Sequence, residues 1–512
     1  MTSRFLTGDT MIDTEATPTV STSVGDLHGR LRDGIHEFLG VPYAAPPTGD
    51  LRFRAPQPPM PWTGVRSATH LGPSAPQIAR DPSSPLPATG YATDESCLFL
   101  NVYTPCPDDH GRPVLIWIHG GSYMTGRGAT VDGGPFARNG DLVVVSINYR
   151  LGLLGFAELG HLDPDLAGSH NNGIRDQIAA LRWVRDNIAA FGGDPNRVTI
   201  AGESAGAGSV MAILASPEAD GLYHRVISQS APASFMPPST ELVTEVIDLA
   251  GVDDIDGLRT LTAEETIEIQ KQLATNAAES AIANPRLPGS ARNGLRPAID
   301  GITLTRSPLQ AAVERRIPLL IGTNLDEGTL FGGHLPNQIS DSLLRSLVAD
   351  HTHDPDTVIE AFRAEQPDAD NHTLALSMIG DTLFRTSSLR VADAAAAANI
   401  PVFTYLFEWE STGFNGFFGS MHALEIPFVW QADLEGAAAG WQRIMGPPGS
   451  WPAELADNMH NAWIGFVRNG EPAHEAIGRW PHYDDTRPTM VFGATTRLEH
   501  DPRGSTRASW EA

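Results

Sequence analysis

The sequence predicts an α/β fold in which helices flank a mostly parallel central sheet. The first observation is a set of short, nearly continuous apolar runs of β-type composition, at residues 114–121, 142–150, 198–202, 225–231, 318–324 and 401–409. Strands that are buried on both faces of a sheet have this composition. The second observation is that helical patterns separate these runs, and such alternation is typical of parallel sheets.

The clearest helical pattern covers residues 173–193. Its apolar residues recur at helical spacing and therefore share one face: they are Ile174, Ile178, Leu181, Val184 and Ile188. Gly192 and Gly193 follow as a stop signal. We therefore expect an amphipathic helix that ends at these glycines.

Two long stretches, 240–300 and 340–400, lack strand patterns and are rich in Ala, Glu and Asp. We interpret them as mostly helical insertions that pack over the edge of the sheet, and not as separate domains. The expected organisation is therefore a single domain at residues 19–505. Residues 1–18 are polar, and we expect them to form a flexible tail.

The composition is that of a soluble protein: the chain has 512 residues, of which 41% are hydrophobic and 19% are charged. Its net charge of −26 argues against a nucleic-acid partner, because a phosphate-binding surface needs basic residues. No run of about eighteen apolar residues occurs, so we expect no membrane span. The first residues lack the apolar core of a secretory signal, and we expect a cytoplasmic location.

The two cysteines, Cys97 and Cys106, flank a segment with a strand pattern. A strand of that length holds their backbones roughly 30 Å apart. A disulfide cannot span this separation. We therefore expect two free thiols, which fits a reducing compartment.

A glycine-rich turn surrounds Ser204 in the stretch VTIAGESAGAG, residues 198–208. Residues 202–206 match G-x-S-x-G, follow an apolar run and precede a helical pattern at 207–216. A nucleophilic serine at a sharp strand-to-helix turn has this context, because the turn leaves room only for small neighbours. The alternative is a glycine-rich turn with a buried serine and no catalytic role.

A second glycine motif, HGGSYMTG at residues 119–126, follows the run VLIWI. Backbone N–H groups of such a loop bind the developing oxyanion in lipases and esterases. Glycine there allows the backbone to approach a substrate oxygen closely. The two motifs together, in this order, indicate a serine hydrolase more specifically than either alone.

With these motifs the chain resembles the type-B carboxylesterases, the group that includes bacterial para-nitrobenzyl esterases, animal carboxylesterases and cholinesterases. The resemblance runs from about Val20 to Phe492. Besides the two glycine motifs, it rests on FLGVPYAAPPTGDLRF (38–53), DESCLFLNVYTP (94–105), NYRLGLLGF (148–156), FGGDPNRV (191–198), WIGFVRNGEP (463–472) and RWPHYD (479–484). It implies the α/β-hydrolase fold, with the helical insertions over the active site.

The resemblance also implies a catalytic triad. Ser204 is the expected nucleophile, Glu327 in GTNLDEGTLF the acid, and His422 in GSMHALEIPFVW the base. Asp326 is the alternative acid. Among the other histidines, His119 is expected to support the glycine loop, and His460 and His482 to have ordinary structural positions.

Further residues follow from the same match. The oxyanion donors are expected to be the backbone N–H groups of Gly121, Ser122 and Ala205, where Ser122 replaces the commoner glycine or alanine. Three polar residues are expected to form a network that orients the base: they are Glu203, Ser230 and Glu425. Each of the three is alternatively a satisfied polar group of the core.

Aromatic and apolar residues near the two loops either line the substrate pocket or pack in the core. Tyr123 and Met124 follow the oxyanion glycines, and Phe414, Phe417 and Phe418 precede the expected base. We expect an open, apolar pocket for small to medium esters.

The resemblance implies hydrolysis of carboxylic esters through an acyl-enzyme. The same triad leaves a carbamate or amide hydrolase open, and the fold also leaves open a non-catalytic binding protein. We expect no metal or cofactor, because neither a Cys/His cluster at ligand spacing nor a phosphate-loop lysine occurs. The expected partner is a small-molecule ester, and the sequence indicates no oligomeric state.

Overall fold

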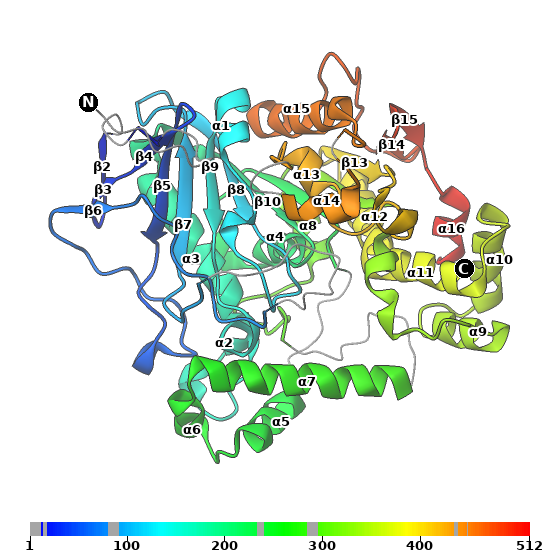
Figure 1. The fold of residues 1–512 in the computed structure, drawn as a ribbon, viewed down its shortest axis with the longest axis horizontal. Coiled ribbons are helices and arrows are strands. Elements are labelled where there is room, and N and C mark those ends of the chain that lie inside the picture. The colour runs from blue at the N-terminus through cyan, green and yellow to red at the C-terminus, as the bar shows by residue number, and fades with distance from the viewer. Residues whose placement is uncertain are drawn as a thin grey trace.

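A large mixed sheet forms the centre of the molecule, and helices cover it (Figure 1). The computed structural model describes residues 12–13, 18–79, 92–232, 240–283, 295–434, 439–447 and 449–511. In these ranges the sheet has twelve strands in the order β1-β4-β5-β7-β9-β8-β10-β11-β12-β13-β14-β15, and a smaller sheet has the order β2-β3-β6.

The strands are β1 Ile12–Asp13, β2 Thr19–Thr22, β3 Gly25–His28, β4 Arg30–Arg32, β5 Ile35–Pro42, β6 Val65–Ser67, β7 Phe99–Thr104, β8 Arg112–Ile118, β9 Val143–Ile147, β10 Gly193–Glu203, β11 Arg225–Gln229, β12 Leu319–Asn324, β13 Val402–Phe407, β14 Pro488–Phe492 and β15 Thr496–His500. The helices are α1 Gly134–Gly140, α2 Gly152–Phe156, α3 Asn172–Asn187, α4 Ala205–Ala215, α5 Thr240–Ala250, α6 Ile255–Thr260, α7 Ala263–Ala283, α8 Pro308–Arg315, α9 Asp341–Ala349, α10 Pro355–Glu365, α11 Asn371–Gly380, α12 Thr386–Ala397, α13 Ile426–Val429, α14 Gln442–Met445, α15 Ala453–Asn469 and α16 Gly504–Ser509.

The middle of the sheet is parallel, as predicted. All six apolar runs form strands, β8 to β13, and every pair from β9 across to β14 is parallel. The outer strands pair antiparallel on both sides. The six predicted runs are buried along nearly their whole length, which is why their apolar composition identified them.

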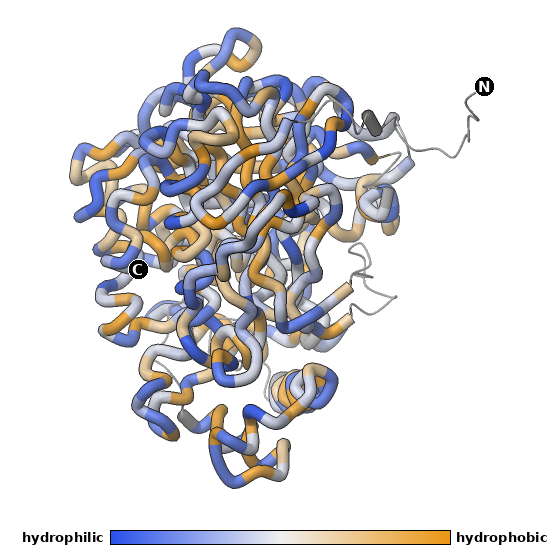
Figure 2. The backbone as a smooth tube through the Cα atoms, turned by 90° about the vertical axis from the view of Figure 1, so that its left-hand side faces the viewer, coloured by the Kyte–Doolittle hydropathy of each residue, from blue (hydrophilic) through white to orange (hydrophobic). Residues whose placement is uncertain are grey.

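Two hydrophobic layers hold the sheet between helices. On β8, Val114 and Ile116 contribute to the layer shared with α3, α4 and α12, whereas Leu115 and Trp117 contribute to the layer shared with α1 and α15. This alternation follows from the strand's two-residue period. Figure 2 shows the apolar segments concentrated inside the molecule.

The predicted helix at 173–193 is present. It consists of α3 and a 3₁₀ extension, Ile188–Phe191, and it ends at Gly192, whose φ of +82° suits glycine. The cysteine prediction is also confirmed: Cys97 and Cys106 flank strand β7 and are both free.

The two expected insertions are helical in their described parts. Residues 240–283 form α5, α6 and α7, and residues 341–397 form α9 to α12 with a π-helical turn, Asp381–Arg385, before α12. The expected packing over the sheet edge is wrong for α12, because Val391, Ala392 and Ala395 pack it on the inner strands β12 and β13. Among the described residues, no helix has the length and apolar composition needed to cross a membrane.

The backbone of the turn between β10 and α4 packs tightly against the end of β8 and against itself. A Cβ atom added to Gly206 would lie 2.1 Å from the carbonyl oxygen of Ile118 on β8. A Cβ added to Gly202 would lie 2.4 Å from the carbonyl carbon of Gly206. Both contacts are with backbone atoms, which cannot move aside as a flexible side chain can. Only glycine fits at these two positions.

The close approach at Gly206 generates a stability prediction. We expect Gly206→Ala to lower the free energy of unfolding by about 3 kcal/mol, because the new methyl group overlaps a strand carbonyl. Thermal unfolding followed by circular dichroism measures the effect. Gly333→Ala is the matched control, since a Cβ there meets no atom within 4 Å. A Gly206→Ala melting temperature equal to that of the wild type would contradict this account.

Candidate active site

The parallel strands bring the predicted site residues to one edge of the sheet. Ser204 directly follows β10, Ser230 directly follows β11, and Glu327 comes three residues after β12. His422 lies in the segment that follows β13. Since the carboxyl ends of parallel strands lie at the same edge, residues far apart in the sequence meet there.

Ser204 occupies a strained turn. Its φ of +56° and ψ of −124° lie outside the backbone regions that residues other than glycine favour. The Ser204 N–H donates to the carbonyl oxygen of Gln229 on β11 at 2.9 Å, and this bond holds the turn against the sheet. Helix α4 begins at Ala205, so the backbone N–H groups of its first turn have no partner within the helix.

His422 contacts Glu327, and not Asp326. The imidazole Nδ1 bonds Glu327 Oε2, and both side chains are buried. Ser230 Oγ donates to the other oxygen, Glu327 Oε1, at 2.5 Å, and the Asn324 N–H donates to it at 2.8 Å. Asp326 instead accepts the Ser420 N–H at 2.9 Å. Glu327 is therefore the carboxylate placed to orient the imidazole.

Glu203 lies on the other side of the imidazole. Its Oε1 is 3.1 Å from His422 Nε2, without hydrogen-bond alignment, and neither atom has a hydrogen-bond partner in the described part of the chain. A Cβ added to Gly120 would lie 3.0 Å from Ser204 Cβ and 2.8 Å from Glu203 Oε2. The glycine loop, the serine and the carboxylate beside Nε2 thus meet at one point.

The pKa values reflect this crowding of charge. Burial alone would lower the pKa of His422, but the carboxylates of Glu203 and Glu327 outweigh it and raise the pKa to about 9. Burial raises the pKa of Glu203 to about 8, against the opposing effect of His422. Burial, together with the charge of Glu327, also raises the pKa of Glu425. The imidazole and the carboxylates around it therefore change each other's proton affinity.

Glu425 is fixed by two amide side chains that sequence analysis did not identify. Gln229 Nε2 donates to Glu425 Oε1 at 3.0 Å, and Asn324 Nδ2 donates to Glu425 Oε2 at 2.8 Å. Trp463 Nε1 in turn donates to Gln229 Oε1 at 3.0 Å. The two amides lie at the carboxyl ends of β11 and β12, and this position in an apolar run is the signal that could have found them.

Two phenylalanines enclose the imidazole and were also missed. The Phe384 ring stacks on His422 with centroids 4.5 Å apart and an interplanar angle of 26°. Phe331 contacts His422 edge-on at 5.0 Å. Phe384 belongs to the π-helical turn Asp381–Arg385, and such turns often occur at functional sites. No local pattern marks either residue.

The loop after β8 leaves backbone donors available. Gly121 has φ +113°, and a Cβ there would lie 2.2 Å from the carbonyl oxygen of Thr125. Ser122 also has a positive φ, +56°. In the described residues, the N–H groups of Gly121 and Ser122 donate to no protein acceptor, while the Gly121 carbonyl accepts the Met124 and Thr125 N–H groups. These free donors lie in the loop that touches Ser204.

The residues considered for the pocket lie in two different environments. Tyr123 is buried in the main core, 5.0 Å from the Phe156 ring, and Met124 packs against the same core. In contrast, Phe414 and Phe417 are 42% and 61% exposed, and both rings contact Phe418. Tyr123 is therefore a core residue, whereas Phe414 and Phe417 are exposed and contact the partly buried Phe418 to form an aromatic cluster before His422.

The other histidines have structural contacts. His119 stacks on Tyr149 at 4.4 Å, and burial lowers its pKa to about 4, so its ring is neutral and supports the glycine loop. His460 bonds the Val429 carbonyl, and His482 lies exposed beside Glu471.

Comparison with known protein families matches residues 16–509 to the family described as "Carboxylesterase family". This chain belongs to the carboxylesterase family. The carboxylesterase is 38% identical to a phenmedipham hydrolase of Pseudarthrobacter oxydans, over 93% of this chain and 94% of that protein. It is 34% identical to a para-nitrobenzyl esterase of Bacillus subtilis, over 95% of this chain and 97% of that protein.

The structural comparison agrees. A crystal structure of a Geobacillus stearothermophilus carboxylesterase matches the carboxylesterase described here with a TM-score of 0.82 at 35% identity, over 96% of this chain and 99% of that chain. The α/β-hydrolase fold and the family resemblance are therefore confirmed, and the chain is a carboxylic ester hydrolase. No group of three or more His, Cys, Asp or Glu side chains able to hold a metal ion occurs in the part that the structure describes.

The position of Glu203 generates a prediction for the pH profile. A histidine must be neutral to accept a proton, so kcat/KM for a neutral ester rises as pH increases through the His422 pKa. We expect this rise above the ordinary histidine range, because the carboxylates raise the pKa of His422 to about 9. Glu203→Gln removes the negative charge 3.1 Å from Nε2 and should lower the apparent pKa by about 1 unit.

This shift in apparent pKa is measured from kcat/KM for para-nitrophenyl acetate at a series of pH values, after correction for spontaneous hydrolysis of the ester. Glu410→Gln is the matched control, because Glu410 is exposed. An apparent pKa that stays the same or rises in Glu203→Gln would rule out this role of Glu203.

The two neighbouring carboxylates generate a second prediction. We expect Glu327→Ala to reduce kcat by roughly 10³–10⁴-fold, since the imidazole loses the partner of Nδ1. Asp326→Ala should reduce kcat less. The Asp326 carboxylate accepts the backbone N–H of Ser420 and makes no hydrogen bond to the imidazole in the described part of the chain. Steady-state kinetics of the two variants at one pH decide between them, and a greater loss in Asp326→Ala would exclude Glu327 as the acid.

Proposed function

We propose that the chain hydrolyses carboxylic esters through an acyl-enzyme formed on Ser204. In the first step His422 removes the hydroxyl proton while Oγ attacks the ester carbonyl carbon, and Glu327 stabilises the resulting imidazolium. His422 then protonates the leaving alcohol. A water molecule, deprotonated by His422, attacks the acyl carbon; the bond to Ser204 Oγ then breaks, His422 returns the proton to Oγ, and the acid is released. The contact of Glu327 with Nδ1, which leaves Nε2 free of hydrogen bonds, is the observation that carries this proposal.

The developing oxyanion binds the backbone N–H groups of Gly121, Ser122 and Ala205. The free N–H groups of the glycine loop and the unpaired N-terminus of α4 support this assignment. Backbone donors held by a close-packed loop need no reorganisation during the reaction. Glu203, Ser230 and Glu425 act behind the triad: Ser230 fixes Glu327, and the two glutamates set the charge around the imidazole.

The substrates are small to medium esters with apolar acyl groups. The aromatic cluster Phe414, Phe417 and Phe418 supports this class, because these rings lie in the loop that leads to His422 and two of them are exposed. Met124 follows the oxyanion glycines, is only partly buried, and is proposed to line the pocket as well. We also propose that residues 19–505 act as a single catalytic domain in the cytoplasm, which the two free thiols support.

The alternative substrate is a carbamate or an amide cleaved by the same triad. The relative named phenmedipham hydrolase, a carbamate hydrolase, favours this alternative over an unspecific esterase. A carbamate differs from an ester in that its carbonyl carbon bears a nitrogen as well as an oxygen, and the nitrogen lone pair makes this carbon less electrophilic. The non-catalytic alternative is not proposed, because the chain is a hydrolase by family.

The nucleophile generates the decisive prediction. We expect Ser204→Ala to reduce kcat on para-nitrophenyl acetate by roughly 10⁴–10⁶-fold and to abolish labelling by a fluorophosphonate probe. Ser228→Ala is the matched control, since Ser228 is a buried serine on the neighbouring strand β11. Activity of Ser204→Ala within tenfold of the wild type would refute the mechanism.

The wild type and the same two variants are assayed on a panel that contains para-nitrophenyl esters of increasing acyl length, phenmedipham and an anilide. Wild-type kcat/KM greatest on phenmedipham would select the carbamate alternative, and greatest on an ester would exclude it. Both outcomes require Ser204.

A further inference from the structure

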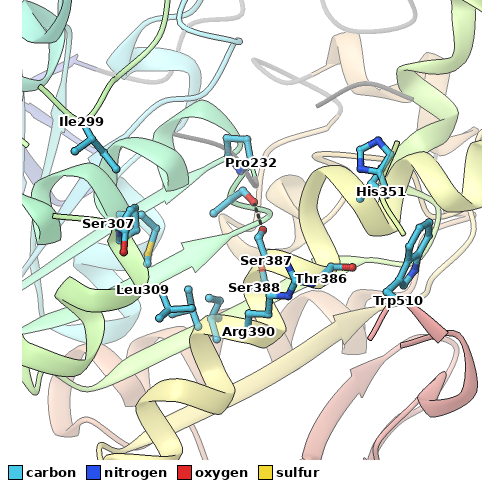
Figure 3. A pocket seen from close by; sticks show the side chains of 16 residues that line it. Pro232, Ile299, Ser307, Leu309, His351, Thr386, Ser387, Ser388, Arg390 and Trp510 are labelled. Atoms are coloured by element: carbon cyan, nitrogen blue, oxygen red, sulfur yellow. Dashed lines mark hydrogen bonds between the residues drawn. The ribbon is translucent and has the colours of Figure 1, made fainter. Parts of the chain in front are cut away.

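A cavity of about 350 Å³ lies between α4, α8 and α12 (Figure 3). Its volume falls within the range of about 300–1,000 Å³ that small-molecule sites occupy. None of Ser204, Glu327 and His422 lines it. The cavity is therefore large enough for a ligand and separate from the residues of the proposed mechanism.

The walls of this cavity combine apolar side chains with several serine and threonine hydroxyls, and they come from several elements. Met211 projects from α4, Ile321 from β12, Leu309 from α8 and Val391 from α12. Walls built from four elements of the fold are held in place by the packing of the sheet and its helices. Such walls favour an apolar chain over a polar one.

The charge of the lining is unusual for this protein. The chain has 61 acidic and 35 basic residues, yet no Asp or Glu is among the described residues that line the cavity. The ionisable side chains there are those of Arg390 and His351. The cavity is thus an uncharged to positive region in a strongly acidic protein, and it favours an anion over a cation.

Arg390 has no carboxylate partner. It forms no ion pair and no hydrogen bond with any described residue, whereas Arg385 and Arg503 nearby bond a carbonyl and a carboxylate. The side chain is exposed, so its guanidinium remains available to a ligand. A guanidinium binds a carboxylate through two parallel hydrogen bonds.

We propose that this cavity binds a monocarboxylate with an unbranched apolar chain, at a site separate from Ser204. The carboxylate pairs with Arg390, and the chain lies against Met211, Ile321 and Val391. One guanidinium balances one negative charge, so a monoanion fits better than a phosphate dianion. Ester hydrolysis releases acids of this class, and that connection alone rests on the proposed function.

Calorimetric titration of octanoate into the whole protein tests the site. Ser204 is first blocked with a small fluorophosphonate, so that the catalytic site contributes no binding. We expect octanoate to bind the blocked protein and Arg390→Gln to weaken that binding by about tenfold or more, because a charge-assisted pair is lost. Arg390→Lys keeps the charge and should retain part of the affinity. Octanol, which lacks the charge, should bind about tenfold more weakly than octanoate.

Arg66→Gln is the matched control, because Arg66 is an exposed arginine on β6 with its guanidinium over the Trp62 ring and no part in the cavity. Three results would each overturn the proposal: no binding of octanoate to the blocked protein, full affinity in Arg390→Gln, or an equal loss in Arg66→Gln. If Ser204 does not react with the fluorophosphonate, the proposed function fails instead, and titration of the unblocked variants decides the cavity.

Discussion

The close contact of the Gly206 backbone with the Ile118 carbonyl is the constraint on which the rest of the site depends. It allows α4 to start directly beside β8, so the strand-to-helix turn can be sharp enough to hold Ser204 at φ +56°. The same contact brings the loop after β8 to within touching distance of Ser204 through Gly120. A larger residue at this crossing would separate Ser204 from the backbone N–H groups of that loop, whatever the side chains elsewhere.

The second organising feature is an imidazole among three buried carboxylates. Buried charges are costly unless they are paired or hydrogen-bonded. Glu327 and Glu425 meet this condition through Ser230, Asn324 and Gln229, which donate to them from the ends of the parallel strands. Glu203 Oε1 accepts no hydrogen bond from the described residues, and burial raises the pKa of this carboxyl. The hydrogen-bonded carboxylates of Glu327 and Glu425 thus fix the geometry, and the carboxylate of Glu203 raises the proton affinity of His422.

Much of this arrangement could be predicted from the sequence because it is encoded locally. The buried strands have continuous apolar runs, and Ser204, Glu327 and His422 lie in short motifs at strand ends. Phe331 and Phe384 could not be predicted in the same way, because their contact with His422 arises only when distant segments pack together. Tyr123 shows the same limit, since an aromatic residue after a glycine loop fits a pocket or a core, and only the packing places it in the core.

The π-helical turn Asp381–Arg385 joins α11 to α12, and the residues within it and after it pack against different parts of the molecule. Before and within it, the chain must present Phe384 to the imidazole; after it, Val391 and Ala395 must face the sheet. A π-turn contains one residue more than an α-turn, and one residue corresponds to a rotation of about 100°. The extra residue therefore reconciles two helical phases in one continuous segment. Deleting a single residue from this turn would therefore misalign one of the two faces.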